Sequence, residues 1–192
     1  MARPTTAVDA AAERYLDTWA ALDPCAATEA GIAGHDDRMT DYSPDGVKAR
    51  AEAARAALQE LDGIEPADGV DVVTVAAMRE RLGVLLEIHD AGLDLGELNV
   101  IASPLQTMRD VFDLMPTDTE DDWATVDRRL AGIPAAVAGY ADALRASTRS
   151  GRTRVDQDRL PAGRHPGPRR GAFAGRRRRR GGPPRVRHHG LA

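Results

Sequence analysis

Two histidines precede residue 150, and His89 has the neighbours that most resemble a reactive site. In the stretch "EIHD", His89 lies two positions after Glu87 and directly before Asp90. An imidazole beside carboxylates can serve as a metal ligand or as a general base. The H-E-x-x-H pattern of zinc peptidases needs a second histidine one helical turn away, and this stretch has none. We therefore interpret His89 as a hydrogen-bonded histidine on the packing face of a helix.

The other histidines offer weaker patterns. His35 stands beside Asp36 and Asp37, and these three side chains could contribute to a cation site. No further ligand is evident in the sequence, so we interpret this segment as a solvated turn. His188 and His189 lie near the end of the chain, where we expect no more than an adventitious metal contact.

A cluster of carboxylates in "TDTEDDW" could be mistaken for a site for a hard metal ion such as Ca²⁺ or Mg²⁺. Hydroxyl groups come first in this stretch and carboxylates follow, which is the order typical of the first turn of a helix. The sequence therefore predicts a helix N-terminus at the four acidic residues Asp118, Glu120, Asp121 and Asp122.

Cys25 is the single cysteine and follows Pro24 at the start of a predicted helix. A helix N-terminus stabilises a thiolate, but no base lies near Cys25 in the sequence, so we interpret it as a small buried residue. The chain contains no G-x-S-x-G, no phosphate-binding glycine loop and no C-x-x-C. We therefore assign no catalytic residue, no cofactor-binding residue and no metal ligand.

The elements that would position these side chains are predicted to be helices. Thr6-x-x-Asp9 is a capping-box pattern, and a polar residue directly followed by proline recurs at three further helix starts. Gly63 is suited to end the helix that begins near residue 44. The three cap-and-proline pairs are Asp23-Pro24, Ser43-Pro44 and Ser103-Pro104.

Apolar residues recur every three or four positions after each of these starts, which is the spacing of one helical face. One such face carries Val75, Met78, Leu82, Leu85 and His89. Similar faces are predicted for Val8, Ala12, Tyr15, Trp19 and Leu22; for Leu105, Met108, Phe112 and Met115; for Trp123, Val126, Leu130 and Ile133; and for Val137, Tyr140 and Leu144.

No segment alternates apolar and polar residues over the length of a strand. The sequence therefore predicts an all-α fold of antiparallel helical hairpins, or a bundle of about seven helices, over residues 1–148. A C-terminal tail follows over residues 149–192. From Gly151 onward the chain holds 13 Arg, 8 Gly and 5 Pro, so we expect this tail to be disordered.

Charge separates the two parts more sharply than the formal net charge of −4 suggests. The tail contains 13 Arg and only 2 Asp, whereas the residues before Gly151 contain 13 basic and 28 acidic side chains. An acidic body repels nucleic acid and anionic membranes, so only the tail could bind them. We expect no signal peptide, no membrane span and a cytoplasmic location.

Two longer stretches resemble a known family in the order of their residues and not only in composition. They are "ALDPCAATEAGIAGHDDRMTDYSPDG" (residues 21–46) and "LNVIASPLQTMRDVFDLMPTDTEDDW" (residues 98–123). Both resemble the N-terminal region of the bacterial family named domain of unknown function 885, and the likeness covers roughly residues 8–144. Members of that family are similar to zincin-type metallopeptidases, are largely helical and are longer than this chain.

The resemblance implies zinc as the cofactor of full-length relatives, held by an H-E-x-x-P-G-H-H-like helix in their later part. No residue here matches a metal ligand or the catalytic glutamate, so no site residue is carried over and no cofactor is expected in this chain. We expect a helical N-terminal fragment that is inactive alone. Its implied partner is the missing C-terminal catalytic region of the family, and a peptide substrate is expected only in the full-length form.

The tail has three interpretations. In GC-rich coding DNA a shifted frame yields mostly Arg, Gly, Pro and Ala, so our leading hypothesis is a frameshift near Thr148, which resequencing across residues 148–164 would test. Codons for residues 160–165, read one base later, permit the Arg-Gln-Val stretch typical of the family.

The alternative function is a small helical binding protein with a basic, disordered nucleic-acid-binding arm. Few aromatic residues accompany the arginines, however, which makes nucleic acid an unfavoured partner. A third possibility is a scaffold whose acidic body binds its own tail.

Overall fold

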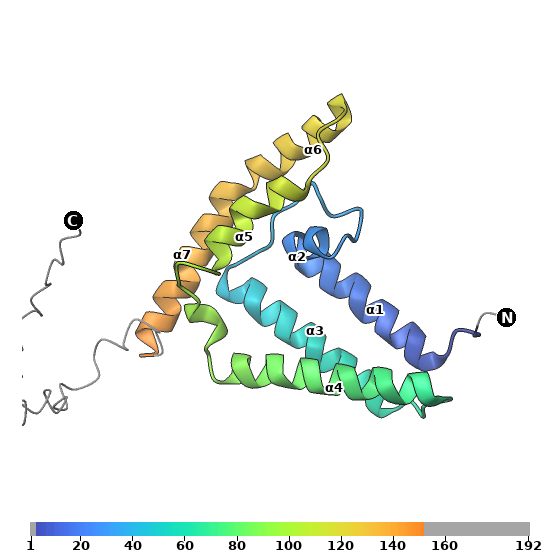
Figure 1. Ribbon diagram of the computed structural model, residues 1–192. Helices are drawn as coiled ribbons and strands as arrows, with labels where there is room; N and C mark the ends of the chain where they lie inside the picture. The colour runs from blue at the N-terminus through green and yellow to red at the C-terminus, as the bar shows by residue number, and fades with distance from the viewer. Residues whose placement is uncertain (1–2, 152–192) are drawn as a thin grey trace, which may run out of the picture. The chain divides into compact units, whose positions relative to one another are not determined.

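A computed structural model describes residues 3–151, which all lie in the first of two units, residues 1–158 and 159–192. Residues 3–151 are helical and contain no strand, which confirms the all-α class (Figure 1). Seven α-helices and two short 3-10 helices make up this range. They are α1 (Ala7–Leu22), α2 (Pro24–Glu29), α3 (Pro44–Asp62), α4 (Gly69–Asp90), η1 (Asp94–Gly96), α5 (Pro104–Asp110), η2 (Val111–Leu114), α6 (Glu120–Ala131) and α7 (Ile133–Arg149).

Side chains cap the helices at the predicted positions. The Thr6 hydroxyl accepts a hydrogen bond from the Asp9 amide at 3.1 Å, and the Asp9 carboxylate accepts one from the Thr6 amide at 2.9 Å. Asp23 and Ser43 each cap a helix whose first residue is proline. Because each cap satisfies an amide that the helix itself leaves free, the helix starts are determined locally.

Helices α3 and α4 form an antiparallel hairpin, and α1 packs against both of them (Figure 1). Two apolar clusters fill the space between these helices, and small alanine side chains allow the backbones to approach closely. The predicted α4 face is confirmed, because its apolar members contribute to both clusters. The buried residues of the clusters are Val8, Ala11, Leu61 and Val75 in one, and Ala54, Ala57 and Leu82 in the other.

A third apolar cluster joins the segment before α3 to α5 and α7. It consists of Tyr42, Met108, Ala136 and Tyr140. Helix α7 follows α6 after the single residue Gly132, whose φ of −81° and ψ of −16° are close to helical values, and it continues in much the same direction (Figure 1). Since α7 also contacts α3 and η1, this cluster connects the α1–α3–α4 group to the later helices.

The predicted inner faces of the last helices are partly wrong. Trp123 is 59% exposed and Leu130 46% exposed, whereas the neighbouring Arg129 is fully buried. Apolar spacing identifies one face of α6, but the face that contacts α2 and the following loop carries Val126 and Arg129. Leu105 and Val137, at 45% and 40%, are likewise exposed outside the core.

No helix among the described residues is long and apolar enough to cross a lipid bilayer. The predicted disorder of the tail concerns mainly residues 152–192, which lie outside the described range.

Candidate functional site

A half-open pocket of about 690 Å³ lies among the described helices. Its walls come from α1, α2, α3, α4, η1, α5 and α7, so nearly every described helix contributes to it. This volume lies within the range of sites that bind small molecules or peptide side chains. We therefore take the pocket as the candidate functional site.

Aromatic residues gather at this pocket. The whole chain has only seven aromatic residues, of which three are tyrosines. All three tyrosines and one of the two tryptophans line the pocket, which leaves few aromatic side chains for any other role. These four residues are Tyr15, Trp19, Tyr42 and Tyr140.

Tyr42 has the most unusual environment of the four. Its side chain is only 9% exposed, and its hydroxyl is buried without a hydrogen-bond partner among the described residues. Cys25 and Thr40 lie beside the hydroxyl. Burial, followed by the proximity of Cys25 and Asp23, raises the pKa of Tyr42 well above its usual value. The phenol of Tyr42 therefore stays neutral, and its hydroxyl is shielded from the solvent in the pocket.

Asp94 lies in the pocket wall and pairs with His89. Its Oδ2 lies 2.7 Å from Nδ1 of His89, which orients the carboxylate. Its Oδ1 is buried and has no hydrogen-bond partner within the described range. The predicted role of His89 as a hydrogen-bonded histidine on a helix packing face is confirmed, and its partner is this aspartate on η1.

Tyr140 ties α7 to the segment after η1. Its hydroxyl donates a hydrogen bond to the carbonyl oxygen of Glu97. Burial also raises the pKa of Tyr140 and of Tyr15 above that of an exposed tyrosine, so both side chains remain neutral at physiological pH. This contact holds the rim of the pocket around residues 97–104.

Charged side chains around the pocket are mainly acidic. Two arginines, Arg50 and Arg81, are present, and both have partners: Arg50 donates to the Asp41 carbonyl oxygen at 2.8 Å, and Arg81 pairs with Glu80 at 3.2 Å. Five carboxylates also line the pocket, so acidic side chains outnumber basic ones there. The carboxylates are Asp23, Glu29, Glu80, Asp94 and Glu97.

Cys25 lies behind the pocket wall and is fully buried, as the sequence predicted. Its amide donates to the Thr40 hydroxyl at 3.0 Å, and that hydroxyl donates to the Asp23 carboxylate at 2.6 Å. This chain of hydrogen bonds fixes the start of α2 against the segment before α3.

The other residues singled out in the sequence do not converge on the pocket. His35 lies in a turn with its Nδ1 2.8 Å from Arg38, which agrees with the predicted turn. Thr119 and Asp122 form a capping box at the start of α6, as expected for the acidic cluster. Residues 3–151 contain no group of three His, Cys, Asp or Glu side chains arranged to hold a metal ion. His188 and His189 lie outside the described residues.

Arg129 is a buried functional group that the sequence analysis missed. Its Nε donates to the Arg38 carbonyl oxygen at 2.9 Å, and its Nη2 donates to the His35 carbonyl oxygen at 3.0 Å and to Thr28 Oγ1 at 2.9 Å. Thr28 in turn donates to Asp36 at 2.6 Å. Arg129 therefore holds α6 to α2 and to the following loop. An arginine in the apolar stripe of α6 was the only available signal.

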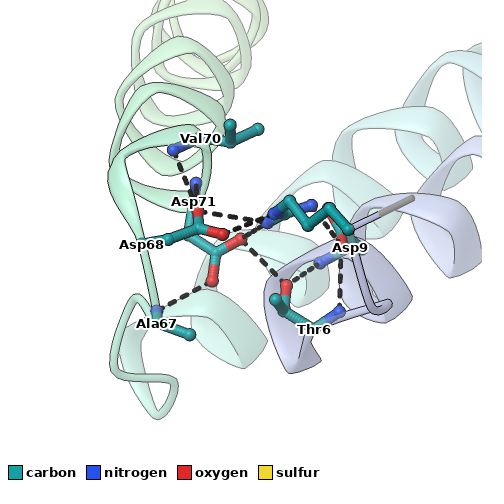
Figure 2. Close-up of polar contacts among 7 residues, drawn as sticks. Thr6, Asp9, Ala67, Asp68, Val70 and Asp71 are labelled. Atoms are coloured by element: carbon teal, nitrogen blue, oxygen red, sulfur yellow. Dashed lines mark hydrogen bonds and ion pairs between the residues drawn. The ribbon is translucent and has the colours of Figure 1, made fainter. Parts of the chain in front are cut away.

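A second acidic cluster joins the N-terminal ends of α1 and α4 (Figure 2). Arg3 pairs with Asp9, Asp68 and Asp71, and the Asp71 side chain is fully buried. Hydrogen bonds from Arg3 and the Asp71 amide lower the pKa of Asp68. The Thr6 amide, followed by Arg3, lowers the pKa of Asp9.

Asp71 is fully used by this cluster. Its Oδ1 accepts from the Thr6 hydroxyl at 2.8 Å and its Oδ2 from the Ala67 amide at 2.8 Å (Figure 2). Since each oxygen of this buried carboxylate already has a protein donor, the cluster stabilises the fold and leaves no site for a ligand.

Comparison with known proteins adds one finding to this geometry. Residues 24–159 match the model of a family described as bacterial protein of unknown function (DUF885). The matched region contains α2 to α7 and most of the residues that line the pocket. A search of curated proteins returned no significant match.

Proposed function

The chain belongs to the DUF885 family, and on this premise we propose that its helices are the non-catalytic part of a zinc metallopeptidase-like protein. In this role the helices form one wall of a peptide-binding cleft, and the chain alone is inactive. The observation that carries the proposal is the pocket, which has the size of a side-chain site and is lined by helices of the matched region.

The residues of the described range do not fit a zinc centre. A catalytic zinc site needs three protein ligands that converge on one point. His89 is engaged by Asp94, His35 faces Arg38, and residues 3–151 bring no third ligand to either histidine. The ligands of a zinc ion would therefore have to come from residues outside 3–151. The described helices carry out no catalytic step in this proposal.

The first experiment measures metal content and hydrolysis on the purified full chain. We expect the zinc content after dialysis to be well below one ion per chain. We also expect no chelator-sensitive cleavage of a mixed peptide library. Stoichiometric zinc together with chelator-sensitive cleavage by this chain alone would contradict the proposal.

The second experiment tests the cleft. A DUF885 region that carries an H-E-x-x-H helix is produced as a separate polypeptide and mixed with this chain. We expect the two to co-elute in size-exclusion chromatography and to cleave peptides faster together than the catalytic region does alone. If the two polypeptides do not associate, the role as a cleft wall is wrong.

The basic composition of residues 151–192 favours a second candidate function, nucleic-acid binding by that segment. Binding through arginines and phosphates would weaken steeply with salt. The test is binding of labelled single-stranded RNA at low and high salt. Replacing Arg176–Arg180 by glutamine should abolish the salt-dependent component.

We further propose that the chain is located in the cytoplasm. Fractionation of cells that express the tagged chain would test this location.

A further inference from the structure

We propose that the outer face of α6 and α7 is the interface through which two copies of this chain form an antiparallel dimer. The proposal goes beyond the function proposed above, because it concerns association of this chain with itself and depends on neither zinc nor hydrolysis. It rests on an exposed apolar stripe, on the symmetry of that stripe about Leu130 and on opposite charges at its two ends.

The exposed apolar stripe is the first observation. Trp123, Leu130 and Val137 are each at least 40% exposed, and we call these three residues the outer stripe. Apolar side chains in water gain free energy when another surface covers them. Tryptophan is also among the residues that contribute most to the stability of protein interfaces. The outer stripe is therefore typical of a face that a partner helix covers.

The outer stripe is continuous although two helices carry it. Its members are seven positions apart, which is close to two full helical turns. Gly132 joins α6 to α7 with nearly helical backbone angles, and the two helices run in much the same direction (Figure 1). On the inner face, the buried residues Val126 and Tyr140 are separated by two steps of the same length. The helical phase therefore continues across the junction.

The spacing of the outer stripe is symmetric about Leu130. Trp123 lies seven positions before this residue and Val137 lies seven positions after it. In an antiparallel pair with a two-fold axis at Leu130, this leucine packs on its own copy and Trp123 packs on the partner's Val137. A large side chain then meets a smaller one on each side of the axis. Because the same surface serves both copies, the assembly closes at two chains, and a second copy is the partner that fits.

Opposite charges beside the outer stripe indicate the direction of pairing. Glu120 precedes Trp123 by three positions and Arg145 follows Val137 by eight, and both charged side chains are exposed. A parallel dimer would bring each glutamate beside its own copy. An antiparallel dimer instead brings Glu120 towards the partner's Arg145, and it opposes the helix dipoles. Arg145 pairs with Asp142 at 2.7 Å, and such an exposed pair is weak enough to exchange.

The first measurement is the oligomeric state of the full-length chain. Sedimentation equilibrium over roughly 1–300 µM covers micromolar dissociation constants and should show a reversible equilibrium between monomer and dimer. A chain that stays monomeric over this range, or that forms ever larger species, would overturn the proposal.

Leu130 and Leu16 provide a matched pair of variants. Both are leucines within α-helices and both are 46% exposed, but Leu16 lies on α1. Leu130→Asp places two carboxylates opposite each other at the axis, so we expect dimerisation to weaken by at least about tenfold. Leu16→Asp should leave the dissociation constant unchanged, and circular dichroism checks that both variants keep their helices. Equal dissociation constants would place the interface on another surface and would contradict the proposal.

Trp123 reports directly on the outer stripe, whether or not Leu130→Asp folds. The chain has two tryptophans, so a Trp19→Phe background leaves Trp123 as the single indole. As the concentration rises, we expect its emission to shift to shorter wavelength and its quenching by acrylamide to fall, because the indole leaves water. Dimerisation without either change would mean that Trp123 lies outside the interface, and the proposal would be wrong.

Charge reversal at low salt tests the direction of pairing. We expect Arg145→Glu to weaken dimerisation by about three- to tenfold, and the added Glu120→Arg to restore it. Arg128→Glu changes the net charge equally at an exposed arginine on another side of α6, and it should have no effect. If Glu120→Arg restores nothing, or if Arg128→Glu acts like Arg145→Glu, the antiparallel arrangement is contradicted.

The catalytic region of the family is the alternative occupant of the outer stripe. If the full-length chain stays monomeric and Leu130→Asp abolishes its co-elution with that region, the stripe binds the catalytic region and the dimer is wrong. Dimerisation of the chain without any co-elution would instead contradict only the role as a cleft wall. The two proposals therefore fail in distinguishable ways.

Discussion

Arg129 shows how a single charged residue can organise the interior of this fold. It is fully buried, and its hydrogen bonds go to carbonyl oxygens and to Thr28 rather than to a carboxylate. The loop between α2 and α3 turns its carbonyl oxygens inward, and these would be unsatisfied without a donor. The guanidinium supplies several donors from one side chain, which apolar residues cannot do. Arg129 therefore donates the hydrogen bonds that these loop carbonyl oxygens would otherwise receive from backbone amides in a helix or sheet.

The prediction at this scale compares neighbouring arginines. We expect Arg129→Ala to lower the free energy of unfolding by about 3 kcal/mol or more, because several buried carbonyl oxygens lose their donor at once. Arg128, which is exposed and donates a hydrogen bond to the Thr125 hydroxyl, is the matched control. Arg128→Ala should change the stability by less than about 0.5 kcal/mol in the same urea titration. Equal effects would show that Arg129 has no special role.

At the scale of elements, helix starts and helix contacts follow different rules. The caps at Thr6, Asp23 and Ser43 depend on a few consecutive residues. The contacts between helices depend on how closely two backbones approach. Gly46 illustrates this difference, because a Cβ atom there would lie 2.2 Å from the Asp41 carbonyl oxygen.

Two glycines on neighbouring helices should respond to alanine in opposite ways. Gly83 lies inside α4 with open space around its Cα, so Gly83→Ala should stabilise the chain by about 0.5–1 kcal/mol through helix propensity. Gly46→Ala should destabilise it by more than about 1 kcal/mol, because the backbone of the segment before α3 must move. Thermal unfolding followed by circular dichroism measures both changes, and a stabilising Gly46→Ala would contradict the close approach.

The junction of α1 with α4 should depend on pH through Arg3. The folded chain lowers the pKa of Asp9 and Asp68 below the ordinary value of 3.8, so their ion pairs stabilise it above that pH. As the pH falls below 3.8 and through the lowered pKa values, both carboxylates take up protons and this stabilisation is lost.

The variant Arg3→Gln tests this dependence in urea titrations at several pH values. We expect it to be less stable than the unaltered chain at pH 7, and the difference to shrink as the pH falls below 3.8. Arg14→Gln is the control, since Arg14 pairs with Glu60 on the exposed surface and such pairs contribute little. A difference that stays constant down to low pH would show that the aspartates do not contribute.

For the molecule as a whole, the described helices leave apolar side chains uncovered. Val100 and Ile101 are 89% and 86% exposed, and Leu98 and Leu105 nearby are also exposed. Clustered exposed apolar residues promote association. These exposed apolar residues lie in or next to residues 97–104, part of which line the pocket.

The corresponding prediction concerns solubility. We expect the double variant Val100→Ser and Ile101→Ser to bind less of a hydrophobic dye and to associate less at high concentration, as measured by light scattering. Its free energy of unfolding should stay within about 0.5 kcal/mol, because neither side chain contributes to the core. A large loss of stability would mean that this segment is packed in solution.

The sequence by itself determined the features that depend on residues close together in the chain. The all-α class, the caps at Thr6, Asp23 and Ser43, the α4 face and the engaged state of His89 all follow from local spacing and hydrogen-bond chemistry. The family was also evident from two continuous stretches, and the match over residues 24–159 confirmed it.

Only the tertiary structure decided which face of each late helix is buried and where a ligand could bind. Spacing placed Trp123 inside and ignored Arg129, because the partner of α6 is a loop whose carbonyl oxygens need donors. Tyr42, Asp94 and Tyr140 are far apart in the chain, and no local pattern brings them together. Packing among non-neighbouring helices creates the pocket, so its aromatic and acidic walls could not be predicted from periodicity.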